Sequence, residues 1–384
     1  MVRPRYIAPV KNPIRRVAVA AAAVALIAGA CSSESKSTDA TSAPAAATAA
    51  PTTPSSAATT TGAPETTAPD TTAPDTTMPD TTDAPVATDA PDTTGAEPTT
   101  DAPETTEAVA TAPFATTTVT QTFVDPSRPT PATPSSAELP TRTIATTIVY
   151  PEAPGPFPLI VLNHGLTGLP SKLSRISTAW ASAGYVVAMP AFPLTNGSVT
   201  DASGNVNDVV NQPGDDSFVI DSMLALSADD SSPLYGRVDG EHIGVAGHSL
   251  GSATTYGVAL NSCCLDERID AIVIMAGFVF IASADNDYSR PLPVMIVHGD
   301  ADPVLNISLD QDVYTQLAGP KWFVTLIGGT HSTGIEDVGT AYDPVVDSST
   351  TDFWNAYLSG DTGAEGALRT DAVVAGVSTL QSGA

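Results

Sequence analysis

Basic residues are scarce in this sequence of 384 residues, in which 15 Lys and Arg stand against 42 Asp and Glu. The formal net charge of -27 argues against nucleic acid as a partner, because a phosphate backbone is bound by a basic surface. Neither a G-x-G-x-x-G nor a Walker motif occurs, so the sequence predicts no nucleotide cofactor.

Leu and Ile are absent from residues 32–118, which hold few larger apolar anchors, Val86, Val109 and Phe114 among them, and 13 acidic residues against one basic residue. Such a segment cannot bury enough apolar surface to offset its chain entropy. Proline recurs every five residues from Pro64 to Pro79, a period too short for a stacked repeat fold. We therefore predict a disordered, semi-stiff tether, with a reach of about 250 Å if fully extended.

The first 31 residues have the order of a secretory signal. Five basic residues precede an apolar run at 17–30, which is shorter than the roughly 20 residues of a bilayer span. Small residues then lead directly to Cys31, and this ending resembles a bacterial lipoprotein signal. The resemblance implies that Cys31 is lipidated and that the protein is secreted and anchored to the outer face of the cell membrane. A non-lipidated signal peptide or a simple anchor helix are the alternatives.

Residues 119–384 have the size of one large α/β domain. Short apolar segments alternate with helical ones, which predicts βαβ units and a mostly parallel, doubly wound sheet flanked by helices. Ligands of such sheets bind at the carboxyl ends of the strands. A long polar loop at 192–215 would border the pocket. The expected strands are 142–150, 158–163, 185–189, 242–246, 271–275, 293–297 and 322–327, and the expected helices are 171–183, 216–228, 250–260, 309–318 and 342–358.

A G-x-S-x-G motif at 247–251 lies directly between an expected strand and an expected helix. A turn this tight strains the backbone of Ser249 and brings chain segments close together, so the flanking positions must lack side chains. The hydroxyl of Ser249 is then presented at the edge of the sheet, beside a helix N-terminus that favours developing negative charge.

The turn at 247–251 is of the kind called a nucleophile elbow. Together with it, the chain resembles the α/β-hydrolase superfamily in three further motifs. A His-Gly loop follows the strand at 158–163, an H-G-x-x-D turn ends at Asp302, and a G-x-x-H turn ends at His331. The order Ser249, Asp302, His331 is the order that this superfamily uses. The segments 183–187 and 353–361 look like those of dienelactone-hydrolase-like and platelet-activating-factor-acetylhydrolase-like esterases, with cutinase-like bacterial esterases as relatives.

This resemblance implies the fold and a set of roles. Ser249 would be the nucleophile, His331 the general base and acid, and Asp302 the group that orients His331. The backbone N–H groups of Leu250 and Leu166 would stabilise the oxyanion. Asp300 is the rival of Asp302 as the acid. The remaining histidines are expected to hold turns (His164 and His298), to pack or hydrogen-bond locally (His248), or to be solvated (His242).

Two other polar features are read as structural. Residues 201–208 carry alternating oxygen side chains but lack the final Glu of an EF-hand loop, so we expect a polar loop and no metal site. Adjacent Cys263 and Cys264 would either close a vicinal disulfide or remain two free thiols.

Together these features predict a secreted, lipid-anchored, monomeric serine esterase that cleaves carboxylic esters through an acyl-enzyme and needs no cofactor. Small activated or short-chain esters are the first expectation for the substrate, and a cutinase-like polyester hydrolase or a lipase is the alternative. An acyltransferase acting on the envelope would keep the same triad. A non-catalytic binding protein would explain the long tether, but it would not need Ser249, Asp302 and His331 in this order.

Overall fold

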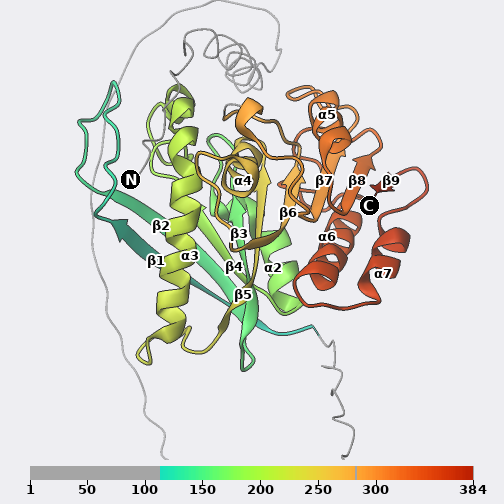
Figure 1. Cartoon of the computed structure of the whole chain (residues 1–384), viewed down its shortest axis with the longest axis horizontal. Coiled ribbons are helices and arrows are strands. Elements are labelled where there is room, and N and C mark those ends of the chain that lie inside the picture. Colours follow the sequence, from blue (N-terminus) through green and yellow to red (C-terminus); the bar gives the residue numbers. More distant parts are fainter. Residues whose placement is uncertain (1–112, 282, 384) are drawn as a thin grey trace, which may run out of the picture. The chain divides into compact units, whose positions relative to one another are not determined.

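The computed structural model describes residues 113–281 and 283–383. Within them lies one mixed sheet of nine strands in the order β1-β2-β4-β3-β5-β6-β7-β8-β9 (Figure 1). The strands are β1 Thr116–Asp125, β2 Arg142–Pro151, β3 Phe157–Asn163, β4 Val186–Ala191, β5 Val238–His248, β6 Ile269–Met275, β7 Val294–Gly299, β8 Lys321–Leu326 and β9 Ser378–Gly383.

The centre of the sheet is parallel and its two edges are antiparallel. Strands β3 to β8 pair only in parallel with one another, whereas β1 and β2 form an antiparallel pair at one edge and β9 runs antiparallel to β8 at the other. This arrangement confirms the predicted mostly parallel α/β-hydrolase sheet, in which the carboxyl ends of the central strands meet at one edge.

Helices connect the strands along the chain. The element α4 begins and ends at the predicted residues, and α2, α3, α5 and α6 differ from the prediction at their ends. Helix α7 was not predicted. The helical elements are η2 Pro170–Leu173, α2 Ser174–Ser182, η3 Ala202–Asn211, α3 Gln212–Ala228, α4 Leu250–Leu260, η4 Ser283–Asp285, α5 Ser308–Gln316, α6 Asp343–Tyr357 and α7 Ala364–Asp371.

Each face of the sheet has its own apolar core. Ile160 of β3 packs in a cluster with Trp180 of α2 and Trp354 of α6, whereas its neighbour Leu159 packs in a second cluster with Val219 of α3. Because successive strand side chains point to opposite faces, a strand covered on both sides must be apolar throughout. Helices α2, α6 and α7 thus cover one face, and α3, α4 and α5 cover the other.

The prediction missed both edge strands and placed the end of the tether too late. Strand β1 begins at Thr116, inside the segment 32–118 that was expected to be disordered, and the ring of Phe114 already packs on that of Phe157 at 5.6 Å. Threonine dominates β1, so its composition continues that of the tether. Its pairing with β2 over ten residues decides its structure.

The prediction of a polar loop at 192–215 was also wrong in part. Residues 202–211 form η3 and α3 begins at Gln212, four residues before the predicted start. Val206 and Val209 are buried and Asp208 pairs with Arg142, so the segment folds because one side of it is held in the interior. In the described part of the chain, no group of three or more His, Cys, Asp or Glu side chains could hold a metal ion.

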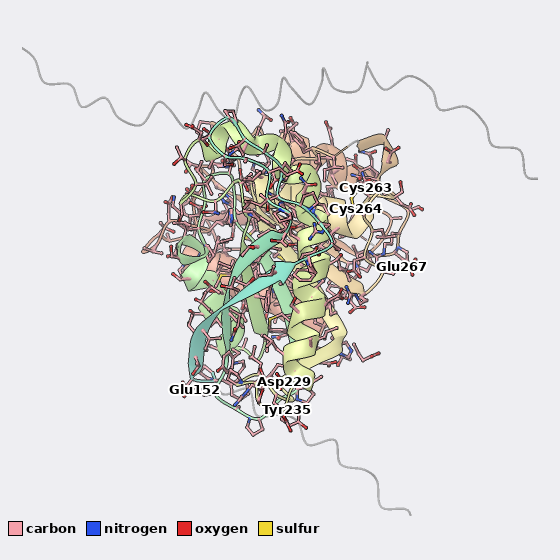
Figure 2. All side chains as sticks on the ribbon, turned by 90° about the vertical axis from the view of Figure 1, so that its left-hand side faces the viewer. Glu152, Asp229, Tyr235, Cys263, Cys264 and Glu267 are labelled. Atoms are coloured by element: carbon pink, nitrogen blue, oxygen red, sulfur yellow. A yellow bond between two sulfur atoms is a disulfide. The ribbon has the colours of Figure 1, made fainter. Side chains whose placement is uncertain are left out.

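Two further predictions concern the cysteines and the N-terminal segment. Cys263 and Cys264, which follow α4, are joined by a disulfide, the first of the two alternatives (Figure 2). The signal peptide at 1–31, lipidation at Cys31 and most of the tether lie outside the described residues. Among the helices that are described, none has the length and apolar character needed to cross a bilayer.

Candidate active site

Ser249 occupies a strained turn between β5 and α4. Its backbone angles are φ 54° and ψ -118°, a conformation that few residues other than glycine adopt. A Cβ atom at Gly247 would lie 2.2 Å from the carbonyl oxygen of Gly251, and one at Gly251 would lie 2.4 Å from that of Asn163. Both flanking glycines are therefore needed sterically, as the motif predicts.

Ser249, His331 and Asp302 come together from three strand ends and form one chain of hydrogen bonds. The Nε2 atom of His331 lies 2.9 Å from Ser249 Oγ, and its Nδ1 atom lies 2.7 Å from Asp302 Oδ2. They follow β5, β8 and β7, whose carboxyl ends meet at one edge of the sheet. The sequence order Ser, Asp, His thus becomes the spatial order Ser, His, Asp.

The groups around these three side chains favour a neutral His331 at pH 7, the form that can act as a base. Burial acts to raise the pKa of Asp302, but hydrogen bonds from His298 and His331 outweigh it and hold that pKa well below its usual range. Burial lowers the pKa of His331, and the hydrogen bond to Asp302 offsets only part of this effect. An ionised Asp302 requires a proton on Nδ1 of His331, which leaves Nε2 free to accept the proton of Ser249.

Asp300, the rival acid, has a different partner. Its Oδ1 atom accepts the backbone N–H of Gly328 at 2.6 Å, and its side chain is exposed. The structure therefore places Asp302, and not Asp300, against His331.

The two predicted oxyanion donors lie beside Ser249. A Cβ atom at Gly165 would be 3.1 Å from Ser249 Cβ, so the loop that carries Leu166 contacts the serine. The backbone N–H groups of Leu166 and Leu250 donate to no other residue that the structure describes, whereas that of Thr167 is bonded to Thr195. The site thus holds two N–H groups that no described residue occupies.

Apolar side chains line this end of the sheet. Those of Leu166 and Leu250 belong to a small cluster, separate from the two main cores, to which η3, the β6–β7 connection and the segment after β7 all contribute. The cluster comprises Val206, Val209, Leu250, Ala253, Phe278 and Leu305, with Leu166, Phe280 and Val304 packed against it.

Two of the other histidines hold turns, as predicted. His164 Nδ1 donates to the carbonyl of Gly165 and its Nε2 accepts the N–H of Phe192, while burial lowers its pKa to about 4. His298 contacts the carboxylate of Asp310 at 2.8 Å; burial opposes its protonation, but hydrogen bonds to Asp302 and Asp310 raise its pKa to about 9. The turns that carry the loop of Leu166 and the acid are thereby fixed.

The last two histidines differ in exposure. His242 is exposed and pairs with Asp239, as expected of a solvated residue. His248 is buried beside His331, where it contacts Glu336 and the carbonyl oxygen of His331. Glu336 and Asp310 were not predicted, because no motif marks them and each reaches its histidine only through the fold.

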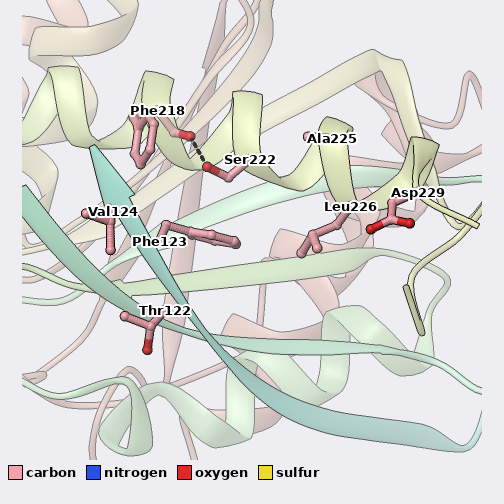
Figure 3. A pocket seen from close by; sticks show the side chains of 8 residues that line it. All are labelled: Thr122, Phe123, Val124, Phe218, Ser222, Ala225, Leu226 and Asp229. Atoms are coloured by element: carbon pink, nitrogen blue, oxygen red, sulfur yellow. Dashed lines mark hydrogen bonds between the residues drawn. The ribbon is translucent and has the colours of Figure 1, made fainter. Parts of the chain in front are cut away.

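A separate groove of about 340 Å³ lies between β1 and α3 (Figure 3). Phe123 of β1 faces Phe218 and Leu226 of α3 across it. None of the residues that line this groove belongs to the predicted site, so the groove is not the candidate active site.

Comparison with known proteins agrees with this fold. The family model described as PET hydrolase-like matches residues 94–340. A solved structure of a ferulic acid esterase from Streptomyces cinnamoneus is similar, with a TM-score of 0.50 and 21% identity, and the match covers 64% of this chain and 91% of the esterase chain. No curated protein matches the sequence significantly. The family match spans most of the chain, and the chain therefore belongs to the PET hydrolase-like family of α/β-hydrolase serine esterases.

Proposed function

We propose that this carboxylic ester hydrolase works through a catalytic triad of Ser249, His331 and Asp302 and a covalent acyl-enzyme. The observation that carries the proposal is the pair of hydrogen bonds, 2.9 Å and 2.7 Å long, that joins these side chains at the carboxyl ends of the strands. The positive φ of Ser249 supports it, since backbone strain of this kind gathers at functional sites.

In the first step, Ser249 Oγ attacks the ester carbonyl carbon while His331 Nε2 takes its proton. The carbonyl oxygen becomes an oxyanion and accepts hydrogen bonds from the N–H groups of Leu166 and Leu250. Each such donor is worth about 3 kcal/mol to the transition state. Asp302 stabilises the imidazolium that forms on His331 and holds its tautomer.

In the second step, His331 returns the proton to the leaving alcohol, the carbon–oxygen bond of the ester breaks, and the acyl group remains on Ser249. Water then attacks this acyl-enzyme with His331 again as the base. The carboxylic acid leaves and Ser249 regains its proton.

A fluorophosphonate probe tests the mechanism directly, because it reacts with activated serines. We expect one probe molecule per chain, mapped to the peptide that contains Ser249, and no labelling of Ser249→Ala. Labelling at another serine, or none in an active preparation, would contradict the assignment.

For the substrate, we propose small or short-chain carboxylic esters, with a polyester as the alternative. The apolar cluster around Leu166 and Leu250 supports an apolar acyl group, and the family description supports the polyester. A panel of p-nitrophenyl esters from acetate to long chains, run beside a polyethylene terephthalate film, separates the two. Release of soluble acid from the film at a rate comparable with short-ester turnover would favour the polyester.

We also propose that a lipid on Cys31 anchors the enzyme to the outer face of the cell membrane. The support is the apolar run and small residues before Cys31 in the sequence. We expect Cys31→Ala to abolish incorporation of labelled fatty acid and to shift the protein from the membrane fraction. Unchanged membrane association without any lipid would point to an anchor helix instead.

A further inference from the structure

A second chain of polar contacts, separate from Asp302, reaches the backbone of His331. Lys172 Nζ lies 3.2 Å from Glu336 Oε2, and Glu336 Oε1 lies 3.0 Å from His248 Nδ1. The Nε2 atom of His248 lies 2.9 Å from the backbone carbonyl oxygen of His331. Thus a carboxylate five positions after the base contacts the residue that precedes the nucleophile.

The turn after His331 makes this contact possible. The backbone N–H groups of Ile335, Glu336 and Asp337 all donate to the carbonyl of Ser332, so the chain doubles back beneath the elbow. The side chains of His248 and Glu336 are 3% and 13% exposed, which keeps their interaction largely out of water.

Both ring nitrogens of His248 face groups that accept hydrogen bonds. A backbone carbonyl can only accept, and Glu336 is ionised because hydrogen bonding and attraction to His248 and Lys172 overcome burial and lower its pKa to about 2. The one form of the His248 ring that can donate to both acceptors is the doubly protonated imidazolium, paired with the Glu336 carboxylate.

This imidazolium lies against the base. The ring centroids of His248 and His331 are 4.9 Å apart. A proton on His331 would place a second positive charge beside that of His248, so repulsion disfavours it. His248 contacts both Glu336 and His331, so the positive charge of the pair acts on His331 more directly than the negative charge of Glu336 does.

The other charged groups near His331 are those of the triad acid and of the ion pairs beside it. Asp302 favours protonation of His331. Asp302 also contacts a second imidazolium, His298, whose other nitrogen pairs with Asp310. His164 at the neighbouring turn is neutral at pH 7, its pKa being about 4. Lys172 lies on the solvent side of Glu336 and is 57% exposed.

Resting on the triad proposed above, we propose that Glu336 is a positioning residue for the ester hydrolysis: it holds His248 as an imidazolium, which fixes the turn of His331 and keeps the base neutral to lower pH than the triad alone would. Glu336 touches no reacting atom and acts through His248.

The test is the dependence of kcat/KM on pH for p-nitrophenyl butyrate with the full chain carrying Glu336→Gln. Without the carboxylate, His248 becomes neutral and no longer repels a proton on His331. We expect the acid limb to move to higher pH by about half a unit to two units, the size of a charge interaction at about 5 Å. We expect His248→Gln to move the limb in the same direction, and Glu336→Asp to restore most of the shift.

Glu267→Gln is the matched control, because it removes the same charge from an exposed carboxylate, and its acid limb should not move (Figure 2). A limb that stays in place in both Glu336→Gln and His248→Gln, even with a lower plateau, overturns the proposal, as does a shift to lower pH. Should Glu336→Gln fail to fold, His248→Gln decides. Failure of the triad is recognised separately, because Ser249 would then not react with a fluorophosphonate in any variant.

Discussion

Two buried polar networks, that of Arg142 and that of Ser249, differ in how fully their polar groups are paired. Arg142, which opens β2, is 0% exposed and donates four hydrogen bonds to the carboxylates of Asp208 and Asp215. In the site, by contrast, the His331 side chain is 15% exposed and Ser249 has a strained backbone.

The difference between these networks is whether a polar atom is left for a substrate. Arg142 binds both carboxylates, which also accept from Arg128 and Asn211, so this network ties η3 and α3 to β2 and leaves no polar group for a ligand. Around Ser249, the N–H groups of Leu166 and Leu250 have no partner among the described residues, and the serine hydroxyl bonds there only to His331. A sealed network contributes to stability, whereas an open one permits reaction at the expense of backbone strain.

The largest expected effect comes from Ser249→Ala, which should lower kcat for p-nitrophenyl butyrate by about 10⁶-fold, because the nucleophile is removed. The free energy of unfolding should change by only about 1 kcal/mol or less, since the variant loses a single hydrogen bond, to a His331 side chain that is partly exposed. Kinetics and urea denaturation measure the two quantities on the same preparation. Substantial residual activity would remove the distinction between the two networks.

Asp302→Asn should lower kcat by about 10⁴-fold, because an amide at this position favours the wrong tautomer of His331. Asp300→Asn is the matched control: this carboxylate is exposed and bonds only to Gly328 in the described chain, so activity should stay within a few-fold of the parent. The same kinetic assay serves both variants. The reverse ranking would make Asp300 the acid.

Arg142→Met should have the opposite effects, a large loss of stability and little change in activity. It leaves Asp208 and Asp215 buried without their main partner, which should reduce the free energy of unfolding by about 3–5 kcal/mol. The folded fraction should keep kcat within a few-fold. Arg268→Met, which removes a partly exposed pair with Asp221 and Asp266, should cost only about 1 kcal/mol or less in urea denaturation. Equal losses of unfolding free energy in the two variants would show that the buried network stabilises the fold no more than a partly exposed ion pair does.

The smallest effect concerns pH. Because the pKa of His331 is lowered from 6.5, the base stays neutral, and activity persists, below that pH. As pH falls through the lowered pKa, His331 gains a proton and can no longer accept one from Ser249. The acid midpoint of kcat/KM for the parent enzyme should therefore lie below pH 6.5, and a midpoint at or above 6.5 would contradict this picture.

Local patterns in the sequence were sufficient for the parts of the fold that are apolar on both faces. Strand β3 and helix α4 were predicted closely, because uninterrupted apolar runs and the glycines around Ser249 carry their own signal. Strands β1 and β9 were missed, since an edge strand is half exposed and its polar composition resembles that of a loop. The same holds for η3, whose order depends on Arg142 of a distant strand.

The sequence by itself therefore determined the class of sheet, the elbow of Ser249 and the turns of Asp302 and His331, because each is encoded within a few consecutive residues. The tertiary structure decided which of Asp300 and Asp302 faces His331, that Glu336 returns to His248, and that Arg142 is sealed between two aspartates. These contacts join residues from 29 to 88 positions apart. Their formation depends on the path of the loops and on burial, which no local pattern records.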